Sequence, residues 1–100
     1  MNEFKLSGKV LDDVRVINDN VARIRLMVSS NTGPDKKLRN DFFDLVAFGE
    51  VSTKLKNNIL INDNIDVKGH LANSRYNDTN GNVVHKNDLI IDKFNKGINS

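Results

Sequence analysis

The sequence predicts an all-β fold, a five-stranded Greek-key β-barrel with one short helix between the third and fourth strands. Three observations support this prediction. Apolar and polar residues alternate with a period of two over most of the chain, as half-buried strands require. Apolar residues recur at a spacing of four over only one stretch, 51–59. A length of 100 residues is enough for one hydrophobic core, so we expect one domain over 1–94 and a short tail over 95–100.

The N-terminal part predicts two amphipathic strands. The first covers 4–11, and Gly8 inside it indicates a bend or a close backbone approach of the kind that a small barrel needs. The second covers 21–29 and places Arg23 and Arg25 on the face opposite its apolar side chains. Two interpretations stay open for these arginines. They contact phosphates, or they lie on a solvated face opposite carboxylates of a neighbouring strand.

A long basic loop is expected over 30–40. Gly33-Pro34 marks a turn, and Lys36, Lys37 and Arg39 give the loop its charge. Long loops in small domains are often functional, although a solvated run of charges is the commoner explanation of a lysine pair.

The segment 41–50 is the third strand, and it carries large apolar groups on both faces. Phe42 and Phe48 share one face, and Phe43 lies on the other. A strand with one solvent-exposed face should carry polar side chains on that face, so we expect another group to cover the two rings. Either another protein element packs on them, or they form a platform on which flat ligands stack.

The C-terminal half predicts a helix followed by a long hairpin. The narrow apolar stripe of 51–59 suits a helix that closes one end of a barrel. The fourth strand covers 65–76 and the fifth 82–93, with a polar turn that ends in Asn80-Gly81.

Composition argues against several classes of function. The chain has no cysteine, which excludes disulfides, thiolate metal sites and cysteine nucleophiles, and its two histidines have no ligand spacing. No nucleophile elbow or phosphate-cradling glycine loop is present. We therefore expect neither an enzyme nor a metal or cofactor. No apolar run is long enough to span a membrane, so we expect a cytoplasmic protein, and the net charge of +2 permits a polyanionic partner.

Four segments together resemble the bacterial-type single-stranded DNA-binding protein. The segments are 22–26 (ARIRL), 42–50 (FFDLVAFGE), 65–71 (IDVKGHL) and the hairpin 75–82 (RYNDTNGN). The resemblance covers about residues 2 to 94. It implies an OB-fold that binds single-stranded DNA without sequence preference and protects it during replication, recombination or repair. It also implies a homo-oligomer, a tetramer or a dimer, located at the nucleoid. The chain also fits a compact version of the kind that a phage or a plasmid carries, and a phage-encoded chain would lie in the host cytoplasm.

The resemblance also implies which residues bind the nucleic acid. Aromatic side chains at the positions of Phe42, Phe48 and Tyr76 lie along the path of the strand in that family, and all three are aromatic here. Stacking contributes about 1–3 kcal/mol per base, and cations along the phosphates add a salt-dependent term. The candidate cations are Arg23, Arg25, Lys36, Lys37, Arg39, Arg75 and Lys86.

Three departures from the family pattern qualify these expectations. The family often has a tryptophan near the end of the second strand, where this chain has Ser30-Asn31-Thr32. Phe43 stands where many relatives have a histidine at a subunit interface, so the oligomeric state can differ. No acidic tip follows Lys96, so recruitment of replication proteins by such a tip is not expected.

Two other functions are compatible with the same fold. In a protein-interaction module of the primosome-accessory kind, Phe42 and Phe48 would be buried against a protein partner, and binding to nucleic acid would depend little on salt. A single-stranded RNA binder would prefer oligo(U) to oligo(dT).

Overall fold

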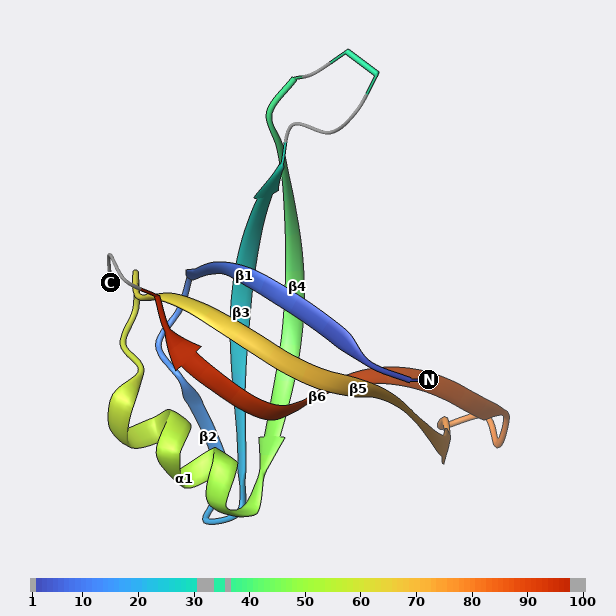
Figure 1. The fold of residues 1–100 in the computed structure, drawn as a ribbon. Coiled ribbons are helices and arrows are strands. Elements are labelled where there is room, and N and C mark those ends of the chain that lie inside the picture. The colour runs from blue at the N-terminus through green and yellow to red at the C-terminus, as the bar shows by residue number, and fades with distance from the viewer. Residues whose placement is uncertain (1, 31–33, 36, 98–100) are drawn as a thin grey trace.

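The computed structural model is a closed β-barrel with one helix at its end (Figure 1). It describes residues 2–30, 34–35 and 37–97. The elements are β1 (Phe4–Val10), β2 (Arg15–Asn18), β3 (Val21–Ser30), β4 (Arg39–Phe48), α1 (Gly49–Asn58), β5 (Asn64–Asn77) and β6 (Val83–Lys96). The strand order is β1-β5-β6-β4-β3, and β1 also pairs with β3, which closes the ring. The predicted five-stranded barrel with a helix between its third and fourth strands is confirmed, and β2 is a short extra strand on the edge of β3.

Three barrel strands, β3, β5 and β6, are longer than the alternation of the sequence predicted, whereas β1 ends one residue earlier, at Val10. The third predicted strand begins two residues earlier and ends at Phe48, because Gly49 and Glu50 belong to α1. β3 reaches Ser30, which pairs with Arg39 at the start of β4, so both ends of the expected loop over 30–40 belong to a hairpin arm. β6 continues to Lys96, so the first two residues of the expected tail belong to the strand. The strands of a hairpin can continue past the point where apolar and polar residues stop alternating. The reason is that the ladder of backbone hydrogen bonds between them needs no apolar side chain.

The core lies inside the barrel and is closed at one end by α1. Its fully buried side chains come from all five barrel strands, and Leu55 and Ile59 come from the helix segment, as the spacing of four predicted. Helix α1 contacts β3, β4 and β6. The buried core residues are Val10, Ala22, Ile24, Leu26, Leu45, Ala47, Leu55, Ile59, Ile65, Val67 and Ile91.

Two glycines allow the barrel to close. Gly8 lies where β1 passes from β5 to β3, and a Cβ atom there would overlap the backbone carbonyl of Met27. A Cβ atom on Gly69 would overlap the carbonyl of Ile90 and lie 2.7 Å from the ring of Phe4. The close backbone approach expected at Gly8 is therefore confirmed.

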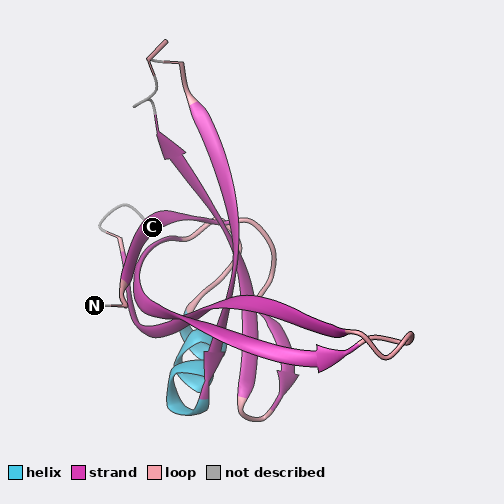
Figure 2. Ribbon diagram, turned by 90° about the vertical axis from the view of Figure 1, so that its right-hand side faces the viewer, coloured by secondary structure: helices cyan, strands magenta, loops and turns pink. Residues whose placement is uncertain are grey.

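Two hairpin arms extend beyond the barrel in different directions (Figure 2). One consists of the ends of β3 and β4, and the other of the ends of β5 and β6. The second arm ends in the predicted turn, where Gly81 has a φ of 80°. The carboxylate of Asp78 accepts hydrogen bonds from the backbone amides of Asn80 and Asn82, both at 2.9 Å, which fixes the turn.

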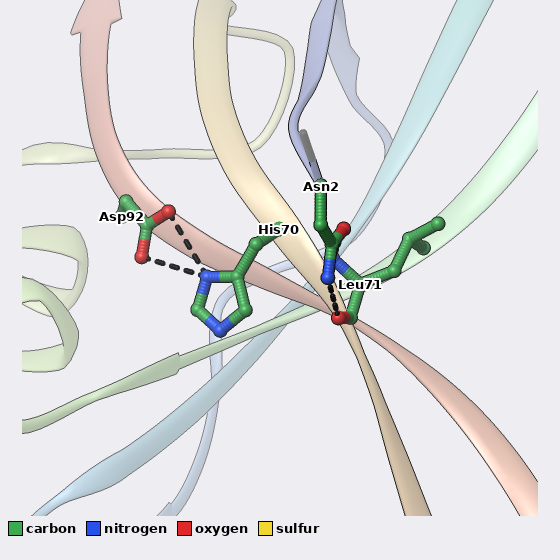
Figure 3. A network of polar contacts seen from close by, with 4 residues as sticks. All are labelled: Asn2, His70, Leu71 and Asp92. Carbon is green, nitrogen blue, oxygen red and sulfur yellow. Dashed lines mark hydrogen bonds and ion pairs between the residues drawn. The ribbon is translucent and has the colours of Figure 1, made fainter.

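The side chain of Asn2 extends the pairing of β1 with β5 by one step (Figure 3). Its amide nitrogen donates to the carbonyl of Leu71 at 2.6 Å, and its Oδ1 accepts from the amide of Leu71 at 2.9 Å. His70 precedes Leu71 on β5, and its Nδ1 lies 3.0 Å from both carboxylate oxygens of Asp92 on β6. These contacts fix β5 at the point where its arm leaves the barrel.

Candidate nucleic-acid interface

The outer face of β4 presents two exposed aromatic rings. Leu45 and Ala47 point into the core, so the alternate positions point outward. Phe42 is 53% exposed and Phe48 is 49% exposed, whereas Val46 between them is only 2% exposed. Because the rings are six residues apart on one strand, about 20 Å separates them. They can serve different bases of one strand but cannot enclose the same base.

A groove opens between β4 and β6 next to Phe42. These two parallel strands pair only through Leu45 with Leu89 and Val46 with Ile90, and beyond that point each strand runs into its own arm. The space between them is about 530 Å³, within the size range of ligand sites. It is lined by Arg15, Arg23, Phe42, Phe43, Asp44, Lys86, Asn87, Asp88 and Leu89.

Two arginines lie directly opposite each other at this groove. Arg15 of β2 is the register partner of Arg23 of β3. Like charges at such positions destabilise a sheet, and within the described residues neither arginine has a carboxylate partner. An anionic ligand in the groove would relieve this repulsion. Arg15 was missed in the sequence because the register of a four-residue edge strand cannot be read from alternation.

One diagonal cross-strand neighbour, Arg25, contacts the ring of Phe42. The guanidinium carbon of Arg25 lies 5.9 Å from the centroid of the Phe42 ring, within cation–π distance. Arg25 Nε also lies 3.8 Å from Asp44 Oδ1. Arg25 therefore supports the ring and is partly neutralised, so it is less available to a phosphate than Arg15 or Arg23.

On the other wall, Lys86 Nζ lies 3.9 Å from Asp88 Oδ1, and the hydroxyl of Ser74 donates to Asp88 Oδ2 at 3.3 Å. The register of the arm puts Tyr76 on the same face as Ser74 and Lys86, and Tyr76 is 53% exposed. Arg75 lies on the opposite face, in register with His85. The structure thus brings Tyr76 and Lys86 together and separates Arg75 from them.

The remaining cations lie on the β3–β4 arm. Arg39 is exposed at the start of β4, and Lys37 is exposed next to it, with its backbone amide donating to Asp35 Oδ1 at 3.1 Å. Lys36 lies outside the described residues. The two described cations are therefore beyond the groove, at the end of an arm.

Two other kinds of feature do not occur in the described part of the chain. No group of three or more potential ligands that could hold a metal ion is present there. No helix among the same residues is long and apolar enough to cross a membrane.

Comparison with known proteins places this geometry in a family. The model of the single-strand binding protein family matches residues 1–96. No curated protein matches the chain significantly. Among solved structures, a small single-stranded DNA-binding protein from Streptomyces coelicolor superposes with a TM-score of 0.68 at 17% identity, covering 97% of this chain and 94% of that one. A mitochondrial single-stranded DNA-binding protein from S. cerevisiae has a TM-score of 0.65 at 12% identity, covering 94% of this chain and 92% of that one. At these identities the two structures support the OB-fold.

Proposed function

Because the chain belongs to the single-strand binding protein family and binds single-stranded DNA, we propose that it does so by stacking bases on Phe42, Phe48 and Tyr76 while cations of the groove contact the phosphates. Every base has a π-face and every nucleotide a charge, so this mode needs no sequence preference. The family consists of DNA-binding proteins, and we assign no catalytic step to this chain. Its role would be to protect single strands during replication, recombination or repair.

One observation carries this proposal. The exposed ring of Phe42 stands at a groove that also contains Arg15 and Arg23, two arginines without carboxylate partners among the described residues. A flat apolar surface beside uncompensated positive charge is complementary to a base attached to a phosphate. The groove opens between the two hairpin arms, and Tyr76 and Lys86 share one face of the β5–β6 arm. A DNA strand that leaves the groove along this arm would meet a further aromatic ring and a further positive charge.

Fluorescence anisotropy tests the proposal. Labelled oligo(dT), oligo(U) and a duplex are titrated with the protein at two salt concentrations, beside Phe48→Ala and the control Leu60→Ala. Leu60 is 67% exposed and does not line the groove. Its truncation therefore removes exposed apolar surface but leaves the proposed stacking rings in place. We expect salt-sensitive binding to oligo(dT), weak binding to the duplex and a loss of affinity only in Phe48→Ala.

Other outcomes would assign the surface differently. A preference for oligo(U) would indicate an RNA binder. Affinity that barely changes with salt, with Phe48→Ala equal to Leu60→Ala, would assign the aromatic face to a protein interface.

We also propose that the chain forms a homo-oligomer. Apolar side chains away from the groove support this, since Leu71 is 50% exposed and Val83 is 58% exposed on the β5–β6 arm. Beyond Leu71 the outer edge of β5 pairs with no described strand, and a second chain could cover it. Sedimentation equilibrium over a range of protein concentrations tests this, and a monomer at every concentration would refute it.

A further inference from the structure

Away from the groove, three lysines form a row across the barrel. Lys5 of β1 is the register partner of Lys68 of β5, and Lys68 is also the register partner of Lys93 of β6. Residues directly opposite each other in antiparallel strands project from the same face, with Cβ atoms about 4.5–5.5 Å apart. Their neighbours Phe4, Leu6 and the other alternate residues pack on the core, so the lysines point outward. We call Lys5, Lys68 and Lys93 the lysine row.

The charges of the lysine row are only partly compensated. Like charges directly opposite each other destabilise a sheet, and the row contains two such pairs. Glu3 Oε1 lies 3.3 Å from Lys68 Nζ. Within the described part of the chain, Lys5 and Lys93 form no ion pair. A bound anion would relieve the repulsion within these two pairs of lysines.

A hollow lies beside the lysine row. Two residues further along the strands, Ser7, Asp66 and Asn95 form a second row in register, and the hollow between the two rows measures about 290 Å³. The hydroxyl of Ser7 donates to Asp66 Oδ1 at 2.6 Å, and the Asp66 carboxylate keeps its negative charge. The hollow is therefore lined by three ammonium groups against one carboxylate, with the side-chain amide of Asn95 as a further donor, so cationic donors that suit phosphate oxygens predominate.

The hollow and the groove are connected along β6. Lys86 lines the groove and Lys93 belongs to the lysine row, and the seven-residue separation of these two positions along β6 corresponds to about 23 Å. Phosphates of a stacked DNA strand are about 3.4 Å apart, so roughly seven nucleotides cover this distance. A longer strand bound in the groove can thus reach the hollow around the outside of the barrel. A second copy stacked face to face here would set two lysine rows against each other, which disfavours that occupant.

We propose that the lysine row and its hollow are a second phosphate-binding site, which holds single-stranded DNA that continues past the groove. The proposal rests on the proposed binding of DNA in the groove. It assigns to Lys5 and Lys93 a role that appears only with strands long enough to reach them.

The test compares the salt dependence of binding for two lengths of oligo(dT). Removing one lysine that neutralises a phosphate should reduce the slope of log K against log [salt] by about 0.7 for a single strand. With an oligonucleotide of about 20 nucleotides we expect Lys5→Gln and Lys93→Gln each to reduce the slope by about 0.7, and the double variant by about 1.4. With about five nucleotides we expect no change, because the strand fills only the groove. Lys56→Gln, which removes one charge from the last turn of α1, is the matched control and should leave both slopes unchanged.

Three results would overturn the second site. The first is a double variant with the slope of the unchanged protein on the long strand. The second is an equal reduction on the short strand, which would put the lysines in the groove. The third is a change of slope in Lys56→Gln as large as that in Lys5→Gln, which would show that the slope depends only on the net charge of the protein. Failure of the groove proposal is distinguishable, since Arg23→Gln would then leave binding of both lengths unchanged.

Discussion

Truncating Phe42 to alanine should weaken single-strand binding without unfolding the protein. If one base stacks on this ring, its loss costs about 1–3 kcal/mol of binding free energy. At 1.4 kcal/mol for each factor of ten, the dissociation constant should rise about 5- to 140-fold. The ring is 53% exposed, so about half of its surface is buried and its removal should lower the free energy of unfolding by only about 1 kcal/mol. The expected loss of affinity is thus separable from any loss of fold.

The assay is anisotropy of labelled oligo(dT) at constant salt, with urea unfolding of each variant as the check on stability. Leu60→Ala is the control for removal of an exposed apolar group. Phe42→Trp should bind more tightly than the unchanged protein, because an indole offers a larger stacking surface. If Phe42→Ala binds as well as Leu60→Ala and Phe42→Trp brings no gain, Phe42 is not a stacking platform and the reasoning fails.

The other predictions concern charge, packing and the edge of the barrel. Arg23→Gln should reduce the salt slope of binding by about 0.7 and leave the melting temperature unchanged or higher, because it removes the repulsion from Arg15; a marked fall in melting temperature would contradict this. Gly69→Ala should lower the free energy of unfolding by about 3 kcal/mol in urea titration, since the new Cβ has no room, and a change below about 1 kcal/mol would show that the strands can separate there. Asn2→Ala should speed hydrogen exchange of the Leu71 amide and cost about 1 kcal/mol of stability, whereas unchanged exchange would mean that another group protects the amide.

Much of the fold was predictable because barrel strands obey a simple rule. Alternation separated the buried side chains of β3 and β4 from Arg23 and Phe42, and the structure keeps each on the predicted face. The turn at Gly81 followed from the tolerance of glycine for positive φ. Strand ends were less predictable, since residues such as Arg39 pair through the backbone and give no apolar signal.

The candidate site was predictable only in part. Phe42 and Phe48 were found because large rings on an outward face need an explanation. Their roles, and that of Tyr76, stay predictions. Arg15 was not found, because its position opposite Arg23 depends on the pairing of a short edge strand. Arg75 was grouped with Tyr76 as a neighbour in sequence, although successive residues of a strand point to opposite faces.

The sequence by itself determined the class of fold, the outward direction of the aromatic side chains and the family to which the chain is similar, because these depend on local period and on short motifs. Only the tertiary structure decided which charges meet. Arg15 faces Arg23, and Lys5 joins Lys93 through Lys68, across strands that are distant in the sequence. The physical reason is register, since closure of the barrel sets which residue lies opposite which, and one residue of slip would turn every side chain to the other face.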